Sequence, residues 1–278
     1  MWPIFFGALA AVSTAIGLML TKSISQRMPA WQVVGPLFLL NTLLVLPAIP
    51  IGPAWKVPSF EIFLLHAFST ILLIAGAACV FLLITRGRAS SVSVGRAVSP
   101  VAVLIAGPIL LGNTESRALI IGAIIVMLGA LLPLRKGFEG ISSGVTLGIL
   151  IFLGFAEGTV TVLTAMLALQ GVGLPEIYIV RTLIAGIFFT LLVLPRDLKL
   201  KDLKPLTVRA VFVTGGYFFT ILGVRDGDVV PVQALWATAP MLVILLEWIR
   251  LRERPQIGAM VGAVVVAIGV LVLLSAAN

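Results

Sequence analysis

Residues 143–169 read SGVTLGILIFLGFAEGTVTVLTAMLAL and contain one charged side chain, Glu157. A helix needs roughly 20 apolar residues to cross the hydrocarbon core of a bilayer, so this stretch is long enough to span a membrane. Charge clusters and Pro/Gly turns separate nine further apolar stretches of comparable length. They cover about residues 2–20, 31–50, 60–85, 92–111, 117–134, 175–194, 206–224, 229–250 and 256–274.

The composition excludes a water-soluble domain. Of 278 residues, 60% are hydrophobic and 11% are charged, about half the charged fraction of a globular protein. His66 is the only histidine and Cys79 the only cysteine, so we expect no intrachain disulfide, no metal site built from His and Cys, and no cofactor. The sequence predicts an all-α integral membrane protein with ten transmembrane helices.

Lysine and arginine are concentrated in alternate connections between the ten stretches. The first, third, fifth, seventh and ninth connections carry thirteen of them, and the other four carry three, namely Lys56, Arg117 and Arg225. By the positive-inside rule, the basic connections face the cytoplasm and both termini face outward. We therefore interpret the net charge of +8 as the orientation signal of a multi-pass cell-membrane protein, and we expect no nucleic-acid partner.

The second half of the chain repeats the first at an offset of 140 residues. Five glycine and proline pairs match without a gap: Gly76 and Gly216, Gly87 and Gly227, Pro100 and Pro240, Gly122 and Gly262, and Gly129 and Gly269. The sequence therefore divides into five-helix repeats at 1–138 and 139–278. Because each repeat has an odd number of spans, the two must lie upside down relative to each other, an arrangement typical of secondary transporters.

A proline within the fourth span of each repeat, and the motif Leu251-Arg-Glu-Arg-Pro255 before a glycine-rich last span, resemble the drug/metabolite transporter superfamily, in particular its EamA-type ten-helix exporters. The resemblance covers the whole chain. It implies a carrier for amino acids, small metabolites or drug-like cations, usually exported. The first span also resembles the opening helix of small multidrug resistance transporters, and this resemblance makes a proton/cation antiporter the alternative. Thr14 stands about where those transporters carry a buried glutamate, so the carboxylate would have to come from the second repeat.

Glu157 is the strongest candidate for a substrate or proton site. It lies near the middle of its span, where a charged side chain costs roughly 2.5–3.5 kcal/mol on insertion scales and is functional by default. Helical spacing places Gly154, Thr161 and Thr164 on the same face. The alternative is a protonated glutamate that bonds a neighbouring helix.

Two arginines within spans are candidate partners of Glu157. Arg181 lies six residues into the seventh span, on a face with Tyr178 and Thr182, and either reaches toward Glu157 or extends to the interface. Arg96 in the fourth span is open to the same two interpretations. A glutamate together with an arginine favours a zwitterion, such as an amino acid, as substrate.

The fourth and ninth spans present equivalent polar or aromatic faces that end at a proline. Gln233, Trp236 and Pro240 match the face of Arg96 and Pro100. We expect both faces to line one cavity, with the two prolines as hinges. Thr14 belongs to the small polar face of the first span, which serves either the site or helix packing.

The fifth and tenth spans carry small residues four apart, at Ala118 and Gly122 and at Gly258 and Gly262. Such faces let helix backbones approach closely. We expect these two spans to pack peripherally, against each other or against a second copy of the chain, so the protein is a monomer or a homodimer.

Other functional classes find little support in the residues. All four aspartates lie in connections, which excludes a paired-aspartate intramembrane protease, and no P-loop is present. A channel would need a ring of repeated polar residues or a filter loop. We therefore expect no enzyme, and a non-transporting membrane protein remains the other alternative.

The topology is tested by single cysteines at positions 25, 201 and 278 in a Cys79→Ala chain. On intact cells an impermeant maleimide should label position 278 and spare positions 25 and 201, because the basic connections are expected to be cytoplasmic. Labelling of 201 without 278 would reverse the assignment.

Overall fold

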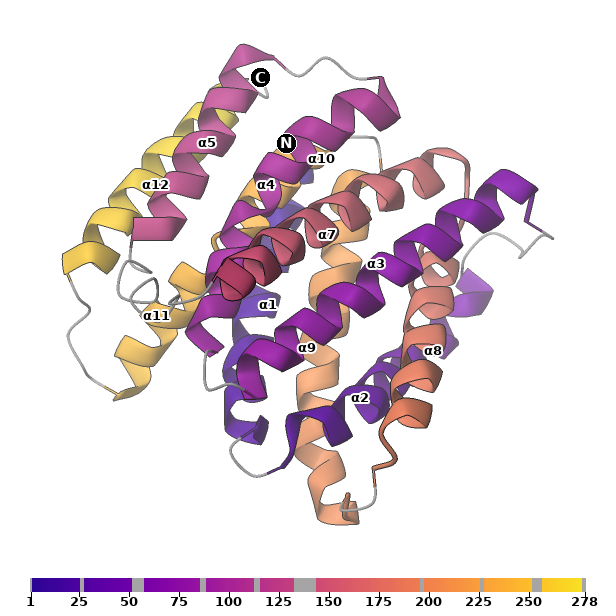
Figure 1. Cartoon of the computed structure of the whole chain (residues 1–278). Helices are drawn as coiled ribbons and strands as arrows, with labels where there is room; N and C mark the ends of the chain where they lie inside the picture. The colour runs from indigo at the N-terminus through magenta and orange to yellow at the C-terminus, as the bar shows by residue number, and fades with distance from the viewer. Residues whose placement is uncertain are drawn as a thin grey trace.

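The computed structural model describes residues 2–25, 28–51, 58–85, 89–112, 116–132, 144–195, 198–225, 228–251 and 257–276. Within these ranges the chain forms helices and no strand (Figure 1). The helices are α1 (Trp2–Ser25), α2 (Ala30–Val45), the 3-10 helix η1 (Leu46–Ile51), α3 (Phe60–Thr85), α4 (Ala89–Leu111), α5 (Arg117–Leu131), α7 (Gly144–Leu169), α8 (Leu174–Leu192), α9 (Leu200–Val224), α10 (Val229–Trp236), α11 (Ala239–Leu251) and α12 (Ile257–Ala276). The predicted repeat boundary at 138/139 and most of the 251–255 motif lie outside the described residues.

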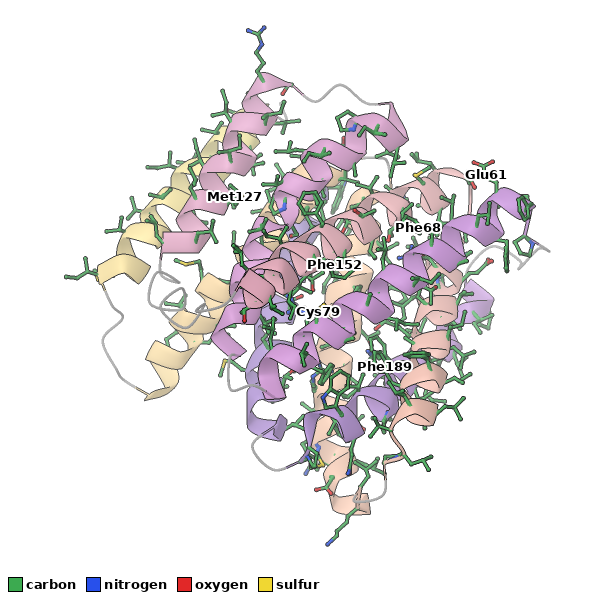
Figure 2. The ribbon with its side chains drawn as sticks, in the orientation of Figure 1. Glu61, Phe68, Cys79, Met127, Phe152 and Phe189 are labelled. Atoms are coloured by element: carbon green, nitrogen blue, oxygen red, sulfur yellow. The ribbon has the colours of Figure 1, made fainter. Side chains whose placement is uncertain are left out.

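The structure is that of a multi-pass membrane protein. In the described part of the chain, six helical stretches are long and apolar enough to cross a bilayer: Trp2–Thr21, Trp31–Pro50, Phe60–Leu83, Gly144–Leu169, Leu174–Leu192 and Asp202–Val224. The other four predicted spans correspond to shorter apolar helices. Large apolar side chains such as Phe68 and Phe152 cover the outer faces (Figure 2), which suits contact with lipid and not with water.

The predicted ninth span is two helices. A turn at residues 237–238 separates α10 from α11, and the Thr238 hydroxyl donates to the carbonyl of Leu235 at 2.6 Å. Pro240 lies in the first turn of α11 and has no N–H to bond the preceding turn. Pro100, its partner in the repeat, lies inside the continuous helix α4. There the Ser99 hydroxyl donates to the Arg96 carbonyl at 2.7 Å, which replaces the bond that proline cannot make.

Glycines allow α7 to pack closely along α4. A Cβ at Gly154 would lie 2.7 Å from the carbonyl oxygen of Gly95, and one at Gly158 would lie 2.5 Å from that of Ser99. From the first contact to the second, the position rises by four residues on α7 and by four residues on α4. The two helices therefore run parallel. Their axes can approach this closely because neither glycine carries a side chain.

Helices α5 and α12 lie side by side at one edge of the molecule (Figure 1). A Cβ at Gly129 would lie 2.7 Å from the nitrogen of Val266, and a Cβ at Gly269 would lie 2.7 Å from that of Val126. The two glycines are 140 positions apart, and so are the two valines. The glycine of α5 therefore contacts α12 in the same way as the glycine of α12 contacts α5. The expected pairing of these helices is thus seen within one chain; a homodimer stays a prediction.

The close packing of α7 on α4 predicts the effect of alanine substitutions. Gly158→Ala should destabilise the protein by about 1–3 kcal/mol, because the new methyl group meets backbone. Gly148→Ala, in the same helix, is the matched control, since a Cβ there meets nothing within 4 Å. The variants are compared by their melting temperatures in one detergent. Equal melting temperatures would show that α4 and α7 can move apart without loss of stability.

Candidate functional site

A cavity of about 120 Å³ lies among α1, α2, α3, α4, α7, α9 and α10. This volume is well above the roughly 10–15 Å³ that one water molecule requires. Its polar or charged lining comes from six of those helices: Thr14, Thr21, Asn41, Arg96, Glu157, Thr161, Arg209, Tyr217, Thr220 and Trp236. Among the described residues, none of α5, α8 or α12 lines it.

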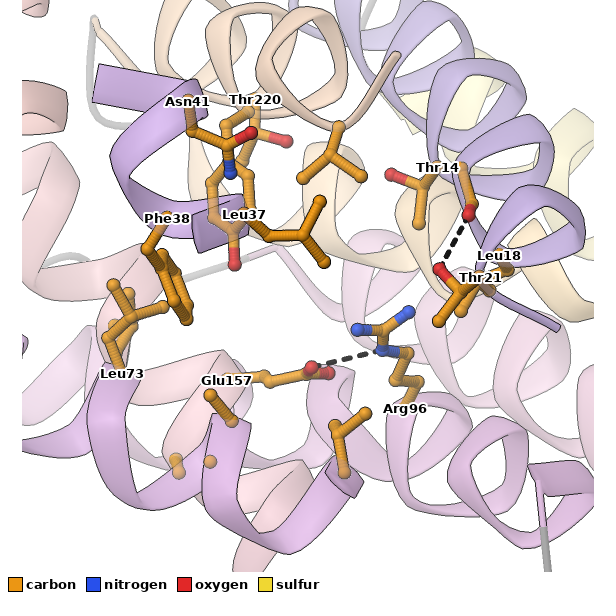
Figure 3. A pocket seen from close by; sticks show the side chains of 18 of the residues that line it. Thr14, Leu18, Thr21, Leu37, Phe38, Asn41, Leu73, Arg96, Glu157 and Thr220 are labelled. Atoms are coloured by element: carbon orange, nitrogen blue, oxygen red, sulfur yellow. Dashed lines mark hydrogen bonds and ion pairs between the residues drawn. The ribbon is translucent and has the colours of Figure 1, made fainter. Parts of the chain in front are cut away.

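Glu157 and Arg96 form an ion pair on one wall of this cavity (Figure 3). The Arg96 Nε donates to the Glu157 Oε1 at 3.0 Å, and the two side chains are 15% and 13% exposed. The pair follows from the packing, because Gly154 and Gly158 bring α4 against the turns of α7 that flank Glu157. Of the two interpretations open for Arg96, the structure shows the inward one: it does not extend to the interface.

The ion pair is continued by Trp236 and Thr14. The Arg96 guanidinium carbon lies 5.4 Å from the centroid of the Trp236 ring, a cation–π distance. The indole Nε1 donates to the Thr14 Oγ1 at 2.8 Å. Four residues singled out in the sequence therefore form one connected set across α7, α4, α10 and α1.

A second polar network lies behind the ion pair. Gln233 is fully buried and does not line the cavity. Its Oε1 accepts from the Thr161 hydroxyl at 2.8 Å, and its Nε2 donates to the Ser99 Oγ at 2.6 Å. Gln233 thus fixes α10 against α4 and α7 and acts on the site through Thr161.

Tyr178 and Arg181 lie outside the cavity. The Tyr178 hydroxyl and the Thr214 Oγ1 are 3.1 Å apart. Arg181 donates from Nε to the Ser69 Oγ at 2.8 Å and from Nη1 to the Thr164 Oγ1 at 2.6 Å. Neither alternative considered for Arg181 is seen, since it is 6% exposed and bonded to hydroxyls, not to Glu157. Its Nη2 has no partner.

The structure adds Arg209, which lies just inside the predicted eighth span and was not predicted to be a site residue. It lines the cavity, and its Nε donates to the Thr21 Oγ1 at 2.6 Å. Helical spacing was the available signal, because Arg209, Val213, Tyr217 and Thr220 share one face of α9. That signal does not show whether the face points to lipid or into the protein.

The Glu157 carboxylate is incompletely satisfied. Among the residues that the structure describes, its Oε2 has no hydrogen-bond partner, although buried polar atoms normally have one. The lining that the structure describes therefore contains one carboxylate with a free oxygen and two guanidinium groups, those of Arg96 and Arg209. Such a site can bind a small molecule through groups of both charges.

A crystal structure of a protein with 15% sequence identity matches this chain with a TM-score of 0.76, covering 99% of this chain and 98% of that chain. At this identity the likeness shows a shared fold. No curated protein matches the sequence. The profile of the EamA-like transporter family matches residues 1–135 and again residues 143–275. Nearly the whole chain is therefore covered by two matches, and the protein belongs to the EamA-like transporter family.

Proposed function

We propose that this protein is a secondary-active transporter that exports a small zwitterionic or cationic metabolite, such as an amino acid, by alternating access. The cavity around Glu157 is its substrate site, with Arg96, Trp236, Thr14 and Thr161 as lining residues. The observation that carries the proposal is an ion pair that lines a cavity of a membrane-spanning bundle.

An ion pair at this depth is a poor device for stability alone. Removing two charges from water costs several kcal/mol per ion, and their attraction repays this only when every lone pair and proton is bonded. Here the Glu157 Oε2 is unbonded. A substrate ammonium or a proton supplies the missing partner, which gives the carboxylate a role in binding and in coupling to pH.

Packing between the two halves supports inverted repeats at 1–138 and 139–278 with ten spans. The contacts of α5 and α12 recur with the helices exchanged. The hydroxyls of Thr42 and Thr182, 140 positions apart, are bonded to each other at 2.8 Å. Gly122 of α5 contacts Leu273 of α12, and Gly129 contacts Val266. The two helices are therefore antiparallel. A two-fold axis that relates antiparallel helices is perpendicular to them, and so lies in the membrane plane.

The two halves differ in what they present to the cavity. On α2, Leu37, Phe38 and Asn41 line it. The residues 140 positions later on α8, Ile177, Tyr178 and Arg181, are buried and do not. If the two halves exchanged their conformations, the α8 residues would line an open cavity and the cavity lined by α2 would close. This asymmetry is what one state of an alternating-access carrier shows.

Orientation in the cell membrane follows from the basic connections, with both termini outside. The cavity extends toward Thr21 and Arg209, which lie near the α1 and α9 ends that the sequence assigns to the cytoplasm. The structure would then be open to the cytoplasm, where an exporter collects its substrate.

The role of Glu157 is tested by Glu157→Gln, which keeps the shape and removes the charge. Transport by proteoliposomes, measured at several pH values with and without a membrane potential, should be lost or lose its pH dependence. Glu61→Gln is the matched control, because Glu61 is exposed at the start of α3 and does not line the cavity. Unchanged rates for Glu157→Gln over the whole pH range would make the glutamate structural.

Alternating access predicts opposite sidedness for Phe38→Cys and Tyr178→Cys in a Cys79→Ala chain. In sealed vesicles of known orientation, an impermeant thiol reagent should reach position 38 from the cytoplasmic side and position 178 from the other. Val126→Cys, buried between α5 and α12, should react from neither. Reaction of 38 and 178 from the same side, or none at 178, would contradict the exchange.

A further inference from the structure

We infer that the substrate carries a carboxylate and that Arg209 is its ion-pair partner in the conformation seen here. The inference rests on the proposed transport function and narrows it, because it separates carboxylate-bearing substrates, such as amino acids, from cations that lack an acidic group.

The charges that line the cavity do not balance. Glu157 is paired with Arg96 at 3.0 Å. Within the described part of the chain, Arg209 bonds the neutral hydroxyl of Thr21, and no carboxylate there lies within ion-pair distance of it. With Glu157 ionised, the described lining carries one positive charge in excess.

A guanidinium that faces a cavity with no carboxylate beside it favours an anion at that place. A buried charge without a partner costs several kcal/mol, whereas an arginine that meets a carboxylate makes two parallel charge-assisted hydrogen bonds. Other lining residues add neutral polar groups to the same cavity, namely Tyr217 and Thr220 further along α9 and Asn41 on α2. The Asn41 Oδ1 has no hydrogen-bond partner in the described part of the chain.

A cation without an acidic group would meet the wrong balance of charge. It would find one carboxylate, already bonded to Arg96, and a second arginine that repels it. A zwitterion satisfies both ends, with its ammonium at the free oxygen of Glu157 and its carboxylate at Arg209.

The symmetry-related pair of positions supports the same assignment. The residues 140 positions from Asn41 and Arg209 are Arg181 and Ser69. These two are bonded to each other at 2.8 Å on α8 and α3, the counterparts of α2 and α9. Each of the two symmetry-related pairs therefore contains one arginine, on α9 in one pair and on α8 in the other, and both arginines come from the second repeat. One cation at each end of the pathway is what transfer of a carboxylate between two half-sites requires.

The test is binding to purified wild-type protein and to Arg209→Gln, measured by thermal shift and by counterflow in proteoliposomes. The first panel is the twenty standard L-amino acids. For every amino acid that binds, its carboxamide and its decarboxylated amine are measured. The second panel holds cations without an acidic group: phenylethylamine, putrescine and tetraphenylphosphonium. Arg117→Gln, at the exposed start of α5, is the control variant.

We expect at least one amino acid to bind, its carboxamide and amine to bind far more weakly, and Arg209→Gln to lower its affinity about 10- to 100-fold. Arg209→Lys should restore part of that loss, since it keeps the charge without the planar fork. The melting temperature of ligand-free Arg209→Gln should not fall, whereas a structural arginine would lower it. Binding of cations or carboxamides that Arg209→Gln leaves unchanged would overturn the inference and leave the transport function standing. Failure of every compound to bind or move would reject both.

Discussion

The ion pair between Arg96 and Glu157 sets the requirement that the surrounding structure meets. Either charge alone inside the bilayer would be costly, and the pair lowers this cost only while α4 and α7 stay within hydrogen-bond reach of each other. Glycines at 154 and 158 make that approach possible, and Ser99 repairs the α4 backbone beside Pro100. Trp236 then covers the guanidinium and connects it to α1 through Thr14. The cavity therefore owes its ion pair to a contact between two helices that belong to opposite halves of the chain.

Hydroxyl side chains solve a general problem for the other buried polar groups. Each of four hydroxyls donates to a carbonyl one turn earlier in its own helix and accepts from a donor on another helix. They are Thr21 with Arg209, Ser69 with Arg181, Ser99 with Gln233, and Thr164 with Arg181. A hydroxyl can do both at once, because it has one proton to donate and two lone pairs to accept. Among the described residues these helices are thereby joined through hydroxyls and not through a second carboxylate, and a hydrogen bond to a neutral hydroxyl can be exchanged for another more cheaply than an ion pair can be broken.

Helices α5 and α12 have a different role from the helices that line the cavity. Their interface is built from glycines against backbone, and neither helix contributes to the described lining. Close contact of this kind resists sliding, because each glycine fits one position on the facing helix. In a carrier that alternates between two states, the pair would hold the two halves together while α2 and α8 exchange their exposure.

Much of the fold follows from the sequence alone. The length of the apolar runs is set by the thickness of the bilayer. A single glutamate in such a run is a candidate for a functional site, whichever helices it packs against. Small residues four apart in the fifth and tenth spans predicted that these spans pack closely, against each other or against a second copy of the chain, because a backbone without large side chains can approach its neighbour. The split of residues 229–250 into α10 and α11 was not predicted, since hydropathy does not register a turn whose polar groups are satisfied locally by Thr238.

Only the tertiary structure decided which arginine belongs to the site. Arg96, Arg181 and Arg209 all lie in apolar helices, and depth along a helix does not say which way a side chain points. That depends on the rotation of each helix, which is set by packing against several others at once. The sequence therefore determined that a charge in the membrane needs a partner, and the packing of α4 on α7 determined that the partner is Arg96, while it left Arg209 facing the cavity and Arg181 bonded to hydroxyls outside it.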